Sequence, residues 1–326
     1  MEVAGQRHPK LDPREEHFSI PSPCPALSLF LRYLPPSVAP RHCRAVLYVH
    51  GGTFPSALSI AHRFDGRSWR DELCDAGFHV WGLDFHGFGF SDPYPEMALP
   101  AEHQAPLGRA TDASRQLKAA IRFIRSHHGV DQIAIIAHSW GSMVTGLLAE
   151  RHPELLDRMV FFGPIALRPC ASDTPQFPAW RLISLKDQWN RFTETVPQGV
   201  APVLTKRHFD PWGEAYLDSD AESRTRSPAS VKVPSGPFQD IFDAWAGQFP
   251  YDPDAIRTPV AIIRGEWDNY CSDTDARWLF DSLASPIKRD IKIGRGTHLM
   301  HLETTRRALY RESVTFLSGR DEPEVR

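Results

Sequence analysis

The sequence has few cysteines and no long hydrophobic run. Its five cysteines are odd in number and never stand in C-x-x-C spacing, so they predict neither a disulfide framework nor a zinc site. They are Cys24, Cys43, Cys74, Cys170 and Cys271. No window approaches the roughly 18 apolar residues of a membrane span, and residues 1–18 are charged, unlike a signal peptide. We therefore expect a cytoplasmic protein with reduced thiols and no membrane partner.

An excess of charge is absent too. The 326 residues include 37 Lys and Arg against 40 Asp and Glu, a formal net charge of -3. With 24% charged and 41% hydrophobic residues, the composition is that of an ordinary globular protein, with no electrostatic reason to bind nucleic acid. A small molecule is favoured as the substrate over a polyanion. The length fits one large domain or a domain that carries an insertion.

Short apolar runs rich in β-branched residues alternate with helix-like segments. The runs lie at 45–50, 78–85, 132–138, 158–163, 259–265 and 289–294. Because their apolar character is continuous rather than alternating, they are typical of strands covered on both faces. A helix is predicted over residues 109–126, and a capping box of Ser68 and Asp71 predicts another that ends at Gly77. This alternation predicts an α/β fold whose mostly parallel sheet carries helices on both faces.

The alternation breaks once, between the strands that end at Gly163 and begin at Pro259. About 95 residues separate them, far more than a simple crossover needs. We interpret residues 164–255 as an inserted helical cap, and residues 1–163 and 256–326 as the core. The insertion is rich in aromatic residues, which either hold it together or line a cleft.

A serine follows one of the predicted buried strands. Ser139 stands in A-H-S-W-G, after the strand 132–138 and before a helix-like segment rich in small residues. Strand, tight turn and helix are the context that a nucleophilic serine on a strained turn requires. A plain turn would give the same pattern, so this motif alone does not distinguish a nucleophile from a structural serine.

A second polar loop follows the strand 45–50 and contains two glycines. Backbone N–H groups in such a loop can stabilise the negative oxygen of a tetrahedral intermediate. We predict that the N–H groups of Gly52 and Trp140 form this oxyanion hole, with Thr53 as the alternative to Gly52. A turn without such a role is the competing interpretation.

Two further residues follow late strands. Asp268 lies after the strand 259–265, where a carboxylate could orient an imidazole; Asp273 is its alternative, although a helix-capping role fits Asp273 better. His298 follows the last strand through a glycine-rich loop and could act as a general base. His301 competes with it, but a surface or capping role is favoured for His301. These two histidines lack a third ligand for a metal site.

Ser139, Asp268 and His298 thus occur in the order nucleophile, acid, base, each after a predicted strand. With this order, and with the turn D-F-H-G-F-G-F-S-D at residues 84–92, the chain resembles the α/β-hydrolase superfamily over nearly all of residues 28–318 outside the insertion. The resemblance implies an eight-stranded, mostly parallel sheet, a helical cap after the sixth strand, a Ser-His-Asp triad, and no cofactor or metal. Ala137 replaces the usual first glycine of the motif.

The resemblance indicates a mechanism more closely than a substrate. A serine nucleophile excludes the dehalogenase and epoxide-hydrolase subfamilies, which use aspartate. The motifs H-S-W-G and H-G-G also resemble those of proline iminopeptidases, and a carbon–carbon bond hydrolase of meta-cleavage products is a further alternative. A binding protein that keeps the fold without catalysis is the alternative of a different class.

We favour a serine esterase acting on a carboxylic ester or lactone. A cap rich in aromatic rings suggests a bulky apolar substrate. The segments H-G-G-T-F-P, S-W-R-D-E-L and L-D-F-H-G-F-G-F-S-D are most similar to serine-dependent macrolide esterases, which open antibiotic lactone rings and so imply antibiotic resistance. The residues expected to contact the substrate are Thr53, Phe54, Trp180, Trp212 and Trp245.

Overall fold

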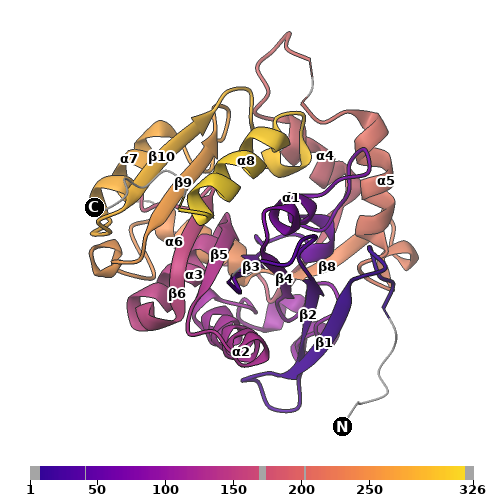
Figure 1. Cartoon of the computed structure of the whole chain (residues 1–326). Coiled ribbons are helices and arrows are strands. Elements are labelled where there is room, and N and C mark those ends of the chain that lie inside the picture. Colours follow the sequence, from indigo (N-terminus) through magenta and orange to yellow (C-terminus); the bar gives the residue numbers. More distant parts are fainter. Residues whose placement is uncertain (1–7, 41, 169–173, 202, 320–326) are drawn as a thin grey trace, which may run out of the picture.

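The computed structural model describes residues 8–40, 42–168, 174–201 and 203–319, and its centre is an eight-stranded sheet (Figure 1). The strand order is β1-β2-β4-β3-β5-β6-β9-β10. The strands are β1 (Glu16–Pro21), β2 (Ser28–Leu34), β3 (Ala45–Val49), β4 (His79–Asp84), β5 (Ile133–His138), β6 (Leu156–Phe162), β9 (Val260–Gly265) and β10 (Lys288–Ile293). From β4 to β10 all neighbours are parallel, whereas β2 is antiparallel to β1 and β4. The predicted α/β fold is confirmed.

Helices cover both faces of this sheet. They are α1 (Trp69–Asp75), α2 (Ala110–His128), α3 (Trp140–Arg151), α7 (Asp273–Ser282) and α8 (Arg306–Leu317). Successive strand residues point to opposite faces, so Leu47 packs with residues of α2, α3 and α7, while Val46 packs with residues of α1 and α8. Short 3₁₀ helices lie at Ser56–Leu58, Pro95–Ala98, Ala101–His103, Pro153–Leu155, Ser223–Thr225, Pro253–Ala255 and Met300–Leu302.

Helix α1 begins where the sequence predicts it. The Ser68 side chain accepts a hydrogen bond from the Asp71 N–H, and the Asp71 carboxylate accepts one from the Ser68 N–H. This reciprocal pair satisfies two N–H groups at the start of the helix. Among the described residues, no helix is both long and apolar enough to cross a bilayer. Of the cysteines, Cys24, Cys43, Cys74 and Cys271 are free thiols, and Cys170 lies outside the described residues.

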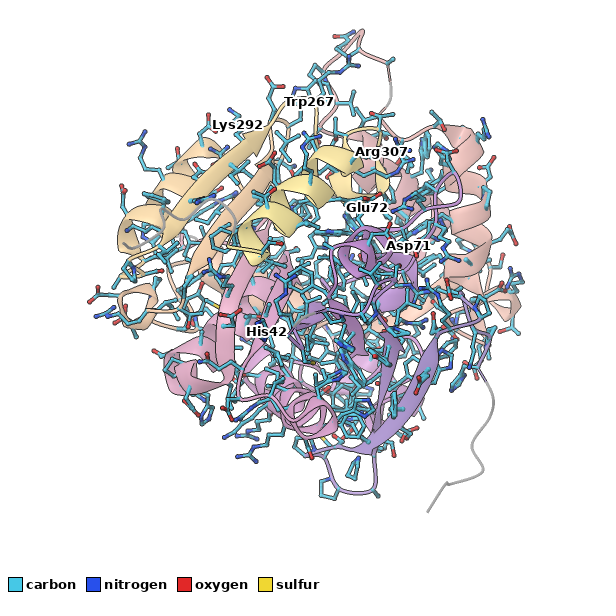
Figure 2. The ribbon with its side chains drawn as sticks, viewed as in Figure 1. His42, Asp71, Glu72, Trp267, Lys292 and Arg307 are labelled. Atoms are coloured by element: carbon cyan, nitrogen blue, oxygen red, sulfur yellow. The ribbon has the colours of Figure 1, made fainter. Side chains whose placement is uncertain are left out.

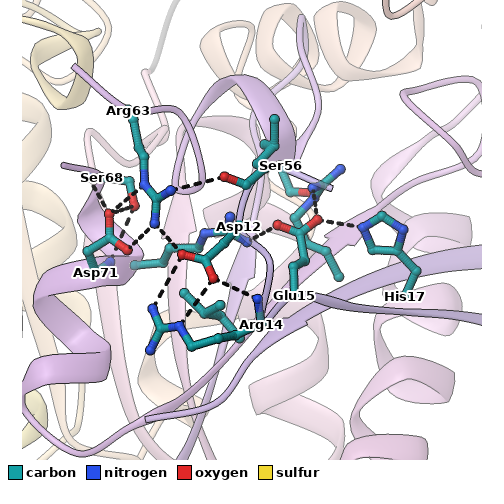
Figure 3. Close-up of polar contacts among 12 residues, drawn as sticks. Asp12, Arg14, Glu15, His17, Ser56, Arg63, Ser68 and Asp71 are labelled. Carbon is teal, nitrogen blue, oxygen red and sulfur yellow. Dashed lines mark hydrogen bonds and ion pairs between the residues drawn. The ribbon is translucent and has the colours of Figure 1, made fainter. Parts of the chain in front are cut away.

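Two carboxylates anchor the N-terminal segment to the core (Figure 3). Arg63 bridges Asp12 and Asp71, which ties the segment before β1 to helix α1. Glu15 is fully buried and accepts a hydrogen bond of 2.7 Å from Arg32. Burial alone would raise the pKa of Glu15, but the His17 hydrogen bond and nearby arginine charges lower it to about 2. The buried carboxylate therefore stays ionised near neutral pH.

The insertion at residues 164–255 contains helices and a small second sheet. Its elements are β7 (Trp180–Ser184), α4 (Leu185–Thr193), α5 (Lys206–Leu217), β8 (Ser230–Pro234) and α6 (Gly236–Trp245). Strands β7 and β8 pair antiparallel and are separate from the main sheet. The helices were expected, but the two strands were not, because each has only five residues and the two lie far apart in the sequence. The division of the chain into a core and a cap stays a prediction.

The two edges of the sheet carry different residues. In Figure 2, Trp267, which follows β9, is labelled near the top of the view, and His42, which precedes β3, is labelled well below it. Because β3, β5, β6 and β9 run in parallel, the residues that follow these strands gather at one edge. Ligands of open α/β sheets bind at this edge.

Candidate active site

Ser139 lies on a strained turn between β5 and α3. Its φ of 55° and ψ of −127° are unusual for a residue with a side chain and cost about 1–3 kcal/mol, which contacts in the surrounding structure must offset. The Ser139 N–H donates to the Phe162 carbonyl at 2.9 Å. A Cβ atom on Gly141 would lie 2.6 Å from the carbonyl oxygen of His50, the residue after β3. Only glycine therefore lets α3 begin this close to the end of β3. The predicted strand, turn and helix are therefore present.

His298 connects this serine to Asp268. Its Nε2 atom lies 2.8 Å from the Ser139 Oγ, and its Nδ1 atom lies 2.9 and 3.1 Å from the two Asp268 carboxylate oxygens. All three side chains are buried. Asp268 also accepts hydrogen bonds from the backbone N–H groups of Tyr270 and Cys271, which fix its orientation. The structure thus brings together the three residues predicted as a triad.

The alternative acid, Asp273, lies elsewhere. It is the first residue of α7, its side chain is exposed, and it pairs with Arg264 and Lys292. The predicted capping role of Asp273 is wrong, because Ser272 caps α7 and forms a capping box with Asp275. Asp273 stands one position after the observed cap residue, and a helix boundary cannot be placed to within one residue from the sequence alone.

The alternative base, His301, is also placed differently from the prediction. It is completely buried, whereas the sequence favoured a surface or capping role. The physical reason is that α8 begins only at Arg306, while residues 300–302 form a 3₁₀ turn that directs the ring into the core. Neither ring nitrogen has a hydrogen-bond partner among the described residues, and burial holds its pKa well below the usual value. No hydrogen bond joins it to Ser139 within those residues.

Two residues that the sequence did not identify, Tyr270 and Gly163, lie against the His298 ring. Tyr270 stacks on it with ring centroids 4.5 Å apart. Gly163, with φ of 52°, lies so close that a Cβ atom there would be 2.8 Å from an Asp268 oxygen and 3.0 Å from the His298 Nδ1. Its position directly after β6, at the edge where the other polar residues gather, was the signal that could have identified it.

The candidate oxyanion donors lie beside Ser139. Trp140 is the first residue of α3, and the first N–H groups of a helix have no partner within the helix. In the part of the chain that the structure describes, the N–H groups of Gly52, Thr53 and Trp140 all lack a hydrogen-bond acceptor. Pro237 of α6 covers Gly52, since a Cβ atom on Gly52 would lie 2.8 Å from the Pro237 Cβ. Gly52 and Thr53 both remain candidates for the second donor.

The residues predicted to contact the substrate are spread over several layers. The Thr53 hydroxyl accepts a hydrogen bond from Arg191, and Trp245 packs on Tyr270 with ring centroids 5.4 Å apart. Phe54 and Trp212 pack edge to face in the interior, where the Trp212 N–H donates to the Leu58 carbonyl. The Trp180 indole N–H donates to the Leu99 carbonyl at 2.9 Å. Their contact with a substrate stays a prediction.

An open cavity of about 650 Å³ begins beside Thr53. It extends between the loop after β4 and strand β8, and its apolar lining includes Phe88, Tyr94, Met97 and Val231. Triad residues do not line it, and Ser139 is buried. Because Pro237 covers Gly52, the conformation described here is one in which α6 lies over the oxyanion loop.

One cluster of potential metal ligands lies at the opposite edge of the sheet. Ligand atoms of Cys43, His79 and His128 lie within 4.8 Å of one another. The His128 Nε2 accepts a hydrogen bond from the Trp81 indole N–H at 2.9 Å, so the neutral ring carries its proton on Nδ1. In this arrangement His128 presents no free lone pair, and we assign no metal to the cluster.

A buried carboxyl group supports the loop that carries His298. Glu303 is fully buried and accepts hydrogen bonds from the backbone N–H and the hydroxyl of Thr297, the residue before His298. Burial raises the pKa of Glu303 to about 7, and the Asp268 charge acts in the same direction, against the Thr297 hydrogen bonds. Glu303 therefore titrates near neutral pH in the folded protein.

This titration predicts a pH-dependent stability. The folded protein binds the Glu303 proton more tightly than the unfolded chain, where the pKa is about 4.5, so the free energy of unfolding falls as pH rises from about 4.5 to about 7. The loss is on the order of 2–3 kcal/mol, and Glu303→Gln should not show it. Urea unfolding of both proteins at pH 5 and pH 8 measures the effect. If the free energies of unfolding of the wild-type protein and of Glu303→Gln differ by the same amount at both pH values, this prediction is wrong.

Comparisons with known proteins agree with this geometry. A family model described as alpha/beta hydrolase fold matches residues 44–305. The human lysosomal acid lipase/cholesteryl ester hydrolase is 29% identical over 97 residues, covering 29% of this chain and 24% of that protein. Epoxide hydrolase 1 of Caenorhabditis elegans is 22% identical over 220 residues, covering 62% of this chain and 50% of its own length. The chain thus spans between a quarter and a half of the curated relatives that it matches.

Solved structures match over nearly the whole chain. A serine hydrolase from Cycloclasticus zankles, a bacterium that degrades polyaromatic hydrocarbons, superposes with a TM-score of 0.60 at 16% sequence identity. The match covers 95% of this chain and 100% of that one. At this level of identity the likeness concerns the fold.

Proposed function

The chain belongs to the α/β-hydrolase fold family, and on this premise we propose that it is a serine hydrolase that cleaves a carboxylic ester or lactone. The family supports hydrolase activity, and the ester or lactone substrate and the triad are the finer part of our proposal. The observation that carries it is the continuous contact from Ser139 through His298 to Asp268, with distances of 2.8 and 2.9 Å. A serine, rather than an aspartate, at the turn after β5 separates the chain from the mechanism of epoxide hydrolases.

The proposed reaction has two halves. The His298 Nε2 takes the Ser139 hydroxyl proton as the Oγ attacks the acyl carbon, and Asp268 stabilises the imidazolium that forms. The carbonyl oxygen becomes negative and accepts hydrogen bonds from the N–H groups of Trp140 and of Gly52 or Thr53. His298 then gives the proton to the leaving alcohol, which in a lactone stays tethered to the acyl group. Water, activated by His298, releases the acid and regenerates Ser139.

The proposed substrate is a bulky apolar molecule. The insertion contributes aromatic rings around the site, among them Trp245, and the cavity beside Thr53 is lined largely by apolar side chains. Together with the resemblance to macrolide esterases, this supports a macrolide lactone as the narrower hypothesis. It stays a prediction that the protein is cytoplasmic, binds neither nucleic acid nor membrane, and needs no cofactor.

A side-by-side substrate panel tests this function. Aryl esters, macrolide lactones, aminoacyl amides and vinylogous acids are incubated with the wild-type protein and with Ser139→Ala, and the products are identified by mass spectrometry. We expect water added across an ester or lactone bond only with the wild type. Cleavage of aryl esters with intact macrolide rings would remove the narrower hypothesis, and cleavage of amides or carbon–carbon bonds alone would replace the ester proposal.

A further inference from the structure

Among the residues that the structure describes, two arginines of the insertion contact no carboxylate. Arg181 in β7 and Arg191 in α4 are half-buried, yet within the described ranges neither forms an ion pair. By contrast, Arg224 and Arg226 each pair with two carboxylates of the insertion. Asp187 lies in the same segment, but its carboxylate accepts the hydrogen bonds of the Ser184 cap. Within the described ranges, neither arginine is therefore neutralised by a contacting carboxylate, although the Asp187 charge acts on Arg181 electrostatically.

Arg191 contacts the loop that carries the candidate oxyanion donors. The Arg191 Nη1 donates to the Thr53 hydroxyl at 2.6 Å, on the loop of the candidate oxyanion donors. Its charge also acts on His138, the residue before Ser139. Arg191 thus approaches the site from the oxyanion side.

Arg181 approaches the site from the histidine side. Its guanidinium lies 4.1 Å from the ring centroid of Phe238, which follows the Pro237 that covers Gly52. It interacts electrostatically with Tyr270, the ring that stacks on His298, and with Arg191. The two guanidinium groups are therefore close enough to act on each other electrostatically.

Several donors of these two side chains lack an acceptor. Among the described residues, the Arg181 side chain makes no hydrogen bond, and the Arg191 Nε is buried without a partner, whereas the Arg191 Nη1 donates to Thr53 and Gln188. Burial and the Arg191 charge hold the pKa of Arg181 below its usual value, as expected for two like charges brought close together. Buried donors and cations of this kind are costly unless an acceptor is supplied. A bound anion would supply it.

We propose that Arg181 and Arg191 form a subsite for a carboxylate group of the substrate, so that the preferred ester or lactone is an anion. A planar guanidinium fork matches a carboxylate through two parallel hydrogen bonds, and the apolar ring of Phe238 strengthens the interaction by excluding water. The ester bond still reacts at Ser139, and the subsite adds the requirement that another part of the substrate carries a carboxylate. An ester with a cationic amine in the same place is repelled. This inference rests on the proposed ester hydrolysis.

Three aryl esters of matched length test the subsite. They are p-nitrophenyl hexanoate, the mono-p-nitrophenyl ester of adipic acid, and p-nitrophenyl 6-aminohexanoate, which end in a methyl, a carboxylate and an ammonium group. We expect the wild-type kcat/KM to be at least about tenfold higher for the adipate ester than for the hexanoate ester, and lowest for the aminohexanoate ester. Arg181→Met and Arg191→Met should each lower the adipate-to-hexanoate ratio by about tenfold, and Arg191→Lys by less.

The ratio distinguishes a lost anion contact from a disturbed oxyanion loop, because both esters share the acyl chemistry. Arg224→Met removes the same charge from the surface of the insertion and should keep the wild-type ratio. An adipate-to-hexanoate ratio near or below one in the wild type, unchanged in Arg181→Met and Arg191→Met, would overturn the subsite.

A binding measurement separates this inference from the proposed function. Calorimetry with Ser139→Ala should detect tighter binding of the adipate ester than of the hexanoate ester, and the difference should vanish when Arg181→Met is added. Equal or absent binding overturns the subsite even if esters are hydrolysed. Selective binding without any turnover by the wild type retains the subsite and refutes the ester hydrolase.

Discussion

Replacing His298 by alanine is expected to lower kcat for an aryl ester by about 10⁴- to 10⁶-fold. The Nε2 of His298 lies 2.8 Å from the Ser139 Oγ, and no other described imidazole is hydrogen-bonded to that oxygen. Without it, the serine hydroxyl attacks with its proton still in place and the leaving alkoxide receives none. KM should change little, because the ring acts on the reacting groups rather than on the rest of the substrate.

A matched histidine elsewhere provides the control for this variant. His152 lies beyond the far end of α3 from Ser139, where it contacts Lys118, so His152→Ala should keep wild-type kcat. Steady-state rates and thermal melting of both variants separate lost chemistry from lost folding. Activity of His298→Ala near the wild-type value would transfer the role of base to His301, although His301 has no hydrogen bond to the serine within the described residues.

Replacing Asp268 by asparagine is expected to lower kcat by about 10⁴-fold while the protein stays folded. The carboxylate accepts the Nδ1–H of His298 and stabilises the imidazolium, and an amide provides neither the charge nor a fixed tautomer. The asparagine oxygen can still accept the N–H groups of Tyr270 and Cys271, which keeps the loop in place. Steady-state assays measure the loss of kcat, and thermal melting followed by circular dichroism measures whether the variant stays folded.

Asp273 provides the internal comparison for the acid. Asp273→Asn removes an exposed carboxylate that pairs with Arg264 and Lys292, so its kcat should stay within about twofold of the wild type. A larger loss of kcat in Asp273→Asn than in Asp268→Asn would reverse the assignment.

The triad could be predicted from the sequence because it depends on topology. Each of Ser139, Asp268 and His298 follows an apolar run, and parallel strands bring the residues after them to one edge of the sheet. The continuous apolar character of β3, β5 and β9 reports burial on both faces, which is a strong signal for parallel strands. The residues at these strand ends could therefore be predicted without knowledge of side-chain packing.

What could not be predicted depends on contacts between distant segments. His301 has the same local pattern as a surface histidine, and only the 3₁₀ turn before α8 directs it inward. Gly163 and Tyr270 act through their distance to the His298 ring, which no periodicity encodes. The absence of an ion pair at Arg181 and Arg191, within the described residues, is likewise a property of the folded chain, because charged residues of both signs are abundant in the insertion sequence.

The central claim is that Ser139 is a nucleophile activated by His298. A fluorophosphonate probe tests it most directly, since the activated Oγ bonds to phosphorus and fluoride leaves. We predict that intact-mass analysis shows one probe added to the wild-type protein, that peptide mapping places it on Ser139, and that Ser139→Ala, folded by its melting curve, gains none. A wild-type protein that stays unlabelled, or a label that persists in Ser139→Ala, would contradict the claim.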